Sequence, residues 1–154
     1  MFHTKKERDC LTKRAREYLM GLMRESENID YRLRVLDDLR FRLNGYDSTL
    51  KTDGVSGSKI GADRIGTYTA RIVDLERELD VATEAYRKKR NNVMLAMIKM
   101  EDARNVDLIM IRYFEGEPWR NVAAALGVSE TWVYTLHNRA LKQFDNVFFG
   151  YTTQ

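Results

Sequence analysis

The sequence predicts an all-α protein, in which a long antiparallel helical hairpin of coiled-coil type precedes a compact helix-turn-helix domain. Its 154 residues contain one proline, Pro118, and four of its nine glycines lie in the single segment 44–62. On both sides of that segment apolar residues recur every seven positions, a spacing typical of helices that pack along their length. We therefore predict a hairpin over 1–100, a helix-turn-helix domain over 101–146 and a C-terminal tail over 147–154.

The first long helix is predicted from Lys5 to Leu43, where only Gly21 interrupts the pattern. At about 1.5 Å per residue this helix extends roughly 60 Å, too far for a small globule to cover unless a second long helix lies beside it. Its seven-residue row consists of Ala15, Leu22, Ile29, Leu36 and Leu43, accompanied by Leu11, Tyr18 and Leu39.

A second long helix is predicted from Asp63 to residue 100, after a loop over 44–62 that is rich in Gly, Ser, Asp and Thr. Two such helices can close into a hairpin within one chain or pair with another copy as a homodimer, and the sequence leaves both open. In either arrangement the rows first of all predict core. The second row consists of Ile65, Ile72, Leu79, Tyr86, Val93 and Met100, flanked by Tyr68, Leu75, Ala82 and Ala96.

The charge is unevenly distributed. The chain carries a formal net charge of +3, but residues 1–100 hold 21 Lys or Arg against 16 Asp or Glu, whereas 101–154 hold 5 against 7. A mildly basic protein is compatible with nucleic-acid binding without requiring it. The densest basic run, "RKKR" at 87–90, could contact phosphate, although such a run is more often a solvated helix face.

Several classes of protein are disfavoured by composition. No apolar run approaches the roughly 18 residues of a membrane span, and the first ten residues lack the apolar core of a secretion signal, so we expect a cytoplasmic protein. The single Cys10 and the two histidines, His3 and His137, provide neither a disulfide nor a zinc site. Without a nucleophile beside a base or a glycine loop for phosphate, we expect neither an enzyme nor a cofactor.

Two helix breaks dominate the segment 101–146. A helix is predicted from about Asp102 to Phe114, and "EGEP" ends it. Pro118 suits the first position of a short helix that continues to about Leu126. Gly127 suits a tight turn because it accepts positive φ, and the Ser129 hydroxyl can cap a further helix that runs to about Phe144.

The spacing of apolar residues around Gly127 is typical of a helix-turn-helix. Two helices that cross steeply through a short turn must bury an apolar set, and a small residue, Ala123, stands where their backbones come closest. A generic two-helix corner reproduces part of this pattern, but the full register favours the DNA-binding unit. The apolar set is Val122, Leu126, Val128, Val133 and Leu136.

If Val133, Leu136 and Ala140 face inward, the opposite face of the last helix would enter the major groove of double-stranded DNA. Thr can donate or accept and offers a methyl group to thymine, Asn can contact adenine in a bidentate manner, and Glu can accept from cytosine. The predicted base-reading residues are Glu130, Thr131, Tyr134, Thr135 and Asn138.

Other polar residues lie near the helix ends, where backbone phosphates would pass. Each has a simpler alternative: Ser129 could only cap its helix and Glu130 could only complement the helix N-terminus. Trp132 could pack on the preceding helix or lie against sugar and phosphate, and we assign His137 to surface or packing. The predicted phosphate-contacting residues are Arg120, Asn121, Ser129, Arg139 and Lys142.

The stretch "LIMIRYFEGEPWRNVAAALGVSETWVYTLHNRALKQF", residues 108–144, resembles region 4 of bacterial sigma factors in its "RYFEG" helix end, its first helix before "LG.S" and its "V...H.RAL" recognition helix. Upstream, the "YL" at 18–19, the "DGVSGS" segment and "IVDLEREL" look like a phage- and prophage-encoded family of sigma-region-4-like proteins related to the ArpU and RinA late transcription regulators. The resemblance implies DNA binding, late phage gene regulation and contact with host RNA polymerase.

The primary hypothesis is therefore a sequence-specific DNA-binding regulator of transcription. One alternative is a small terminase-like packaging subunit, which also joins a helix-turn-helix to oligomerising helices. The other is a protein that binds RNA polymerase or a sigma factor without touching DNA, as the acidic C-terminal third allows. A module with few cations should bind DNA weakly alone, and dimerisation or a polymerase partner would compensate.

Overall fold

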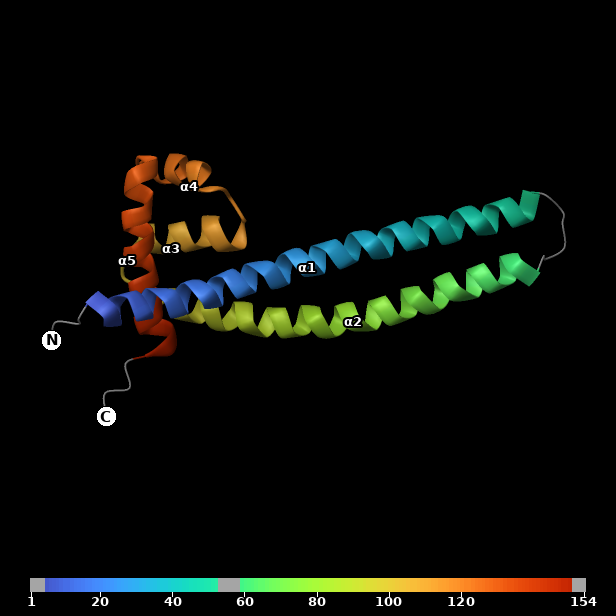
Figure 1. Cartoon of the computed structure of the whole chain (residues 1–154), viewed down its shortest axis with the longest axis horizontal. Coiled ribbons are helices and arrows are strands. Elements are labelled where there is room, and N and C mark those ends of the chain that lie inside the picture. The colour runs from blue at the N-terminus through green and yellow to red at the C-terminus, as the bar shows by residue number, and fades with distance from the viewer. Residues whose placement is uncertain (1–4, 53–58, 151–154) are drawn as a thin grey trace. The chain divides into compact units, whose positions relative to one another are not determined.

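The computed structural model describes residues 5–52 and 59–150, with side chains over 12–45 and 61–150, and these residues contain helices and no strand (Figure 1). The all-α prediction is confirmed. The helices, in chain order, are α1 (Lys5–Thr52), α2 (Lys59–Met97), α3 (Ala103–Ile109), the π-helix η1 (Met110–Phe114), α4 (Trp119–Leu126) and α5 (Glu130–Phe149).

The predicted loop over 44–62 is wrong in extent, because α1 continues to Thr52 and α2 already begins at Lys59. Its centre, 53–58, lies outside the described residues. Each Gly, Ser, Thr or Asp in a helix costs at most about 1 kcal/mol relative to Ala, a penalty that neighbouring turns can offset. A polar, glycine-rich composition therefore lowers the helix propensity of these segments but does not prevent them from being helical.

Contacts group the chain into two compact units. Unit 1 comprises residues 1–25 and 87–154, and unit 2 comprises residues 26–86. Both α1 and α2 contribute to both units. Residue 100, where the sequence suggests the end of the hairpin, lies inside unit 1, which also holds α3, η1, α4 and α5.

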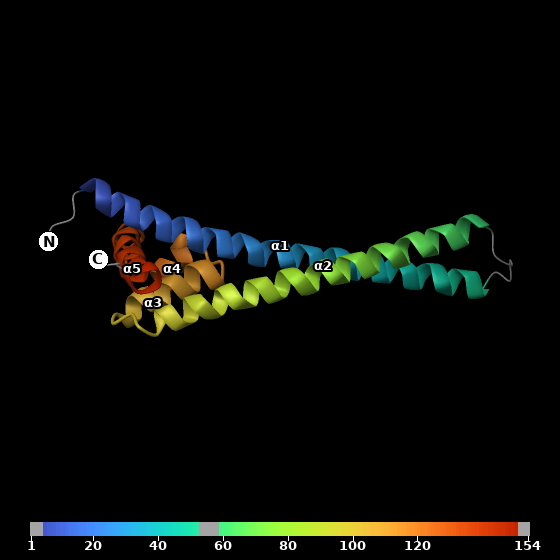
Figure 2. The same ribbon diagram turned by 90° about the horizontal axis from the view of Figure 1, so that it is seen from below.

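Unit 2 consists of the parts of α1 and α2 that lie side by side in opposite directions (Figure 2). Arg40 and Glu76, 36 residues apart, form an ion pair of 2.7 Å between the two helices. These segments therefore pair within one chain, which is the hairpin arrangement of the two that the sequence left open. The buried residues are Leu36, Leu39, Ile72 and Leu79, with Ile29, Val35, Leu43, Tyr68 and Leu75 packed against them.

Unit 1 has a deeper interior to which every one of its helices contributes. Phe144, Leu141 and Leu108 are completely inaccessible to solvent. Ala15 and Leu22 of the first predicted row, Val93 and Met100 of the second, and the flanking Ala96 are also buried here. The predicted rows thus supply core to both units, although in unit 1 they meet additional helices.

The helix predicted over 102–114 has a different ending. It begins at Ala103 because Asp102 is the N-cap, whose carboxylate accepts from the Arg104 backbone N–H at 3.0 Å. Its last part, Met110–Phe114, is a π-helix, in which Glu115 N donates to Met110 O at 3.1 Å across five residues. Such wide turns are rare and occur mostly as single insertions within α-helices.

Candidate nucleic-acid interface

The turn between α4 and α5 has the predicted local geometry. Gly127 ends α4 with φ 65° and ψ 35°, the left-handed conformation that glycine adopts without a Cβ clash. Val128 N donates to Ala123 O at 3.0 Å and satisfies a carbonyl group at the helix end. Pro118 lies one position earlier than predicted: it is the N-cap of α4, with extended ψ 154°, and Trp119 is the first helical residue.

One face of α5 packs against α4 and the preceding helices. Val122 and Ala123 of α4 are buried, as are Val133 and Leu136 of α5, whereas Leu126 and Val128 are half-buried. Three members of the predicted apolar set, Val122, Val133 and Leu136, thus form the interior between these helices together with the small residue Ala123. Figure 1 shows α4 beside the beginning of α5.

The opposite face of α5 is exposed along its first three turns. We call this face the α5 ridge and define it as Thr131, Tyr134, Thr135 and Asn138, all of which are exposed. The buried positions of this segment, Val133, Leu136, His137 and Ala140, lie on the other face of the helix. The structure therefore brings together four of the five predicted base-reading residues. Glu130 is also exposed, in the first turn of the helix.

The predicted phosphate-contacting residues have varied local roles. Ser129 is a cap, because its Oγ accepts from the Trp132 backbone N–H at 3.1 Å. The Asn121 side chain donates to Glu117 Oε2 at 2.7 Å, which orients it within α4. Arg120 and Lys142 are exposed with no such contact in the described part of the chain.

Trp132, whose two predicted placements were against the preceding helix or against sugar and phosphate, is exposed to solvent. Its side chain is 44% exposed, and the Arg139 guanidinium lies 5.3 Å from its ring centre. A cation over an aromatic face at this distance is attracted by the ring quadrupole. Trp132 and Arg139 therefore form a paired, solvent-facing edge next to the α5 ridge.

Another tryptophan, Trp119, fills the space between α4 and α5, and sequence reasoning assigned it no role. Its ring lies 4.6 Å from the His137 ring and 5.3 Å from the Tyr134 ring. The Arg112 guanidinium covers it at 4.9 Å. The only sequence signal was its position directly after Pro118, where an apolar residue at a helix start can pack back on the next helix.

His137 is buried and uncharged in this packing. Burial, together with the nearby positive charges of Arg16 and Arg112, lowers the pKa of His137 to about 4. Burial also raises the pKa of Tyr113 to about 12, so the phenol keeps its proton. The Tyr113 hydroxyl and His137 Nε2 form a buried hydrogen bond of 2.7 Å between two uncharged groups. Of its two predicted roles, His137 has the packing role.

The far end of α5 is fixed to the start of α1. Arg14 donates from Nε and Nη2 to the two carboxylate oxygens of Asp145, at 3.0 and 2.6 Å, and Asp145 is 1% exposed. Bidentate pairs of this kind restrict orientation as well as adding energy. This contact joins residues 131 positions apart. It holds α5, which carries the α5 ridge, against α1 within unit 1.

The predicted tail over 147–154 is partly helical, because α5 continues to Phe149. The reason is aromatic packing: the Phe148 and Phe149 rings lie 4.7 and 5.9 Å from the Tyr18 ring of α1. Helix residues gain more from such burial than from propensity alone. These aromatic residues therefore cover the core of unit 1.

Unit 1 is strongly basic although its C-terminal part is acidic. The sequence of unit 1 holds 17 Lys or Arg against 11 Asp or Glu, a net charge of +6, whereas unit 2 holds 9 against 12, a net charge of −3. The difference arises because the start of α1 and the "RKKR" run belong to unit 1. All four residues of that run are exposed; Lys89 pairs with Glu25, and Arg90 lies 5.7 Å from the Phe114 ring centre.

Comparison of the chain with protein-family models, with curated proteins and with solved structures found no match. Within the described ranges, 5–52 and 59–150, no helix is long and apolar enough to cross a membrane.

Proposed function

We propose that this protein is a sequence-specific DNA-binding regulator of transcription that inserts α5 into the major groove of double-stranded DNA. The observation that carries the proposal is the exposed α5 ridge, held by a buried opposite face and a glycine turn. Thr and Asn side chains at one-turn intervals match the donors and acceptors that base edges present in that groove. The sequence resemblance extends the proposal to a late-gene activator of a phage, with host RNA polymerase as a partner.

The charge of unit 1 supports this proposal. Counter-ion release supplies much of the affinity of DNA-binding proteins, so a recognition helix needs cations nearby. Residues 101–154 alone are net acidic, but the unit to which α5 belongs has a net charge of +6. Arg120, Arg139 and Lys142 lie on α4 and α5 and are exposed, so they are the first candidates for phosphate contacts.

The test replaces two ridge residues, Thr135 and Asn138, with Ala. Binding-site selection followed by a gel-shift titration measures sequence preference in the wild type and in the variant. We expect the preferred site to lose about tenfold or more in affinity, since each base contact contributes about 1–3 kcal/mol, while binding to unrelated DNA changes little. A matched control, Asn28→Ala with Thr83→Ala, changes two exposed residues of the same types in unit 2 and should leave the preference intact.

Unchanged preference in the ridge variant would contradict the proposal. A second candidate function, protein binding without DNA contact, is favoured by the exposure of Trp132 and Tyr134, at 44% and 51%. Large aromatic side chains are over-represented among residues that dominate protein interfaces. Retention of RNA polymerase by the wild type, with no salt-sensitive DNA shift, would select this function, and a ring of many copies would instead select a packaging subunit.

A further inference from the structure

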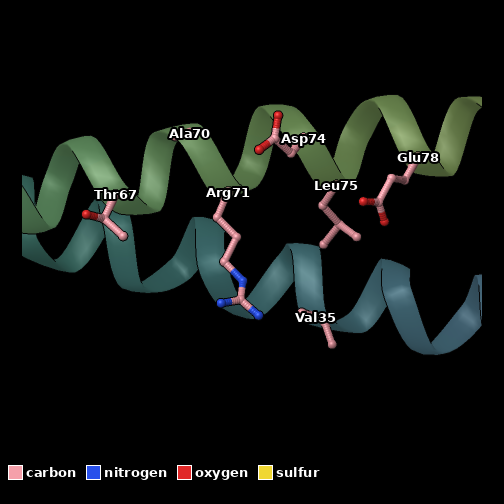
Figure 3. A pocket seen from close by; sticks show the side chains of 7 residues that line it. All are labelled: Val35, Thr67, Ala70, Arg71, Asp74, Leu75 and Glu78. Atoms are coloured by element: carbon pink, nitrogen blue, oxygen red, sulfur yellow. The ribbon is translucent and has the colours of Figure 1, made fainter.

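Unit 2 has a shallow groove along one side of its helix pair. Two adjoining hollows of about 600 and 670 Å³ share Glu78 and together follow α2 from Thr67 to Ala85. Figure 3 shows the first hollow, where Leu75 points toward Val35 of α1 while Asp74 points away from α1. At about 1.5 Å per residue the groove is roughly 27 Å long, which is five turns of helix.

The lining of the groove suits a helix as its occupant. Small side chains recur along it at Thr67, Ala70, Ala82 and Ala85, so a second backbone can approach closely. An apolar side chain, Val81, also lines it and is 72% exposed. Helices of bundles pack at such stripes, with side chains of one entering the gaps of the other.

Most of the charged side chains that α2 contributes to the groove have no partner among the described residues. Arg71, Asp74 and Arg77 make no hydrogen bond or ion pair with other described residues. Glu78 has only a long contact of 3.9 Å to Arg32. The groove therefore offers two positive and two negative α2 side chains for contacts with another molecule.

Along α2 these charges are arranged so that the helix is complementary to an antiparallel copy of itself. In an antiparallel pair of α2 helices related by a two-fold axis near Leu75, Arg71 of one copy faces Glu78 of the other, and Asp74 faces Arg77. Each contact occurs twice, as it must in a two-fold interface where the same patch serves both partners. A parallel arrangement would place like charges opposite each other, which is unfavourable.

We propose that two copies of this chain associate through this groove, with α2 of one copy antiparallel to α2 of the other, so that the two helix pairs form a four-helix bundle. The net charge of unit 2, −3, opposes association only weakly, because salt screens charges beyond about 8 Å under physiological conditions. The close pairs then decide the register. This inference rests on unit 2 alone and does not depend on DNA binding.

The test is a charge exchange between two variants of the full-length chain. Arg71→Glu with Arg77→Glu makes the α2 side of the groove acidic, and Asp74→Lys with Glu78→Lys makes it basic. Sedimentation equilibrium of the wild type should give twice the 18.1 kDa mass of one chain. We expect each variant alone to weaken dimerisation about tenfold or more, and an equimolar mixture of the two to restore a dimer.

Two further variants keep the result decisive. Val81→Asp places a charge on the apolar lining and should also give a monomer, with circular dichroism checking that the helices remain. Arg34→Glu reverses an exposed charge on α1 that does not line the groove, and it should leave the dimer intact. A monomeric wild type, an assembly larger than a dimer, or a dimer that the groove variants do not weaken would each overturn the proposal.

Discussion

Unit 1 and unit 2 are built from the same two long helices, yet they differ in both interior and charge. In unit 1 the helices meet α3, α4 and α5, and side chains such as Leu19, Leu108 and Phe144 lose all contact with solvent. In unit 2 only two helices are present, and every residue of its core retains 4–8% exposure. A seven-residue apolar row therefore does not determine how deeply its residues are buried. The depth of burial depends on how many helices surround the row.

The charges follow the same division, with +6 in unit 1 and −3 in unit 2. The basic unit contains the α5 ridge, and the acidic unit contains the self-complementary groove. If both proposals hold, unit 1 provides the electrostatics of DNA binding and unit 2 provides the pairing of copies. Linking two weak DNA contacts in this way can raise affinity greatly without any new contact to DNA.

The largest loss of stability should appear when a leucine is truncated, and it should differ between the two cores. Leu141→Ala in unit 1 should destabilise by about 3–4 kcal/mol, because a fully enclosed site cannot collapse around the cavity. Leu79→Ala in unit 2 should cost about 2 kcal/mol, because two helices can close the gap. Denaturant unfolding monitored by circular dichroism measures both values. Equal losses would mean that the two interiors are equally rigid.

A loss of stability somewhat smaller than that of Leu141→Ala should appear in unit 1 on acidification, because the only two histidines are His3 and His137 and neither belongs to unit 2. The pKa of His137 falls from 6.5 to about 4 on folding, so the unfolded chain binds more protons between these values. Stability from this group is fully present above pH 6.5 and is lost as the pH falls toward 4, on the order of 3 kcal/mol in total.

Hydrogen exchange at several pH values reads the two units separately. We expect protection in unit 1 to fall more steeply with acid than protection in unit 2. His137→Gln keeps a hydrogen-bonding group beside the Tyr113 hydroxyl but does not titrate. It should therefore remove the extra pH dependence of protection in unit 1, while the pH dependence that arises from carboxylates remains. An unchanged slope in this variant would show that His137 is not the titrating group.

Local patterns in the sequence were enough to predict the helices, turns and caps, but not the contacts between residues that are far apart in the sequence. The turn at Gly127, the cap at Ser129 and the buried rows were predictable because each depends on residues within a turn or two. The contact of Arg14 with Asp145 was not, since it joins residues 131 positions apart and nothing local distinguishes either from a surface charge. The basic character of unit 1 was hidden for the same reason.

The exposed face of α5 was predictable, because its buried face fixes it by periodicity. Periodicity does not distinguish the environments of Trp119 and Trp132. Helical spacing places both near the α4–α5 turn, but it does not decide which one fills the interior. The structure assigns that position to Trp119, whose ring meets His137, and leaves Trp132 beside Arg139. The choice depends on the three-dimensional space between helices, which spacing alone does not describe.

The smallest expected effects separate two ion pairs, one from each unit. Arg14→Met in unit 1 leaves Asp145 buried without its partner, so we expect a loss of about 2 kcal/mol, reduced from the full cost of a broken buried pair because Arg14 itself is half-exposed. Arg40→Met in unit 2 removes a pair of similar length, 2.7 Å, whose two side chains are 50% and 42% exposed, and it should cost about 0.5 kcal/mol.

The measurement is the unfolding free energy of both variants at low and high salt. If burial sets these energies, salt should abolish the effect at Arg40 and leave most of the effect at Arg14, whereas equal losses at both sites would show that length and not burial is decisive.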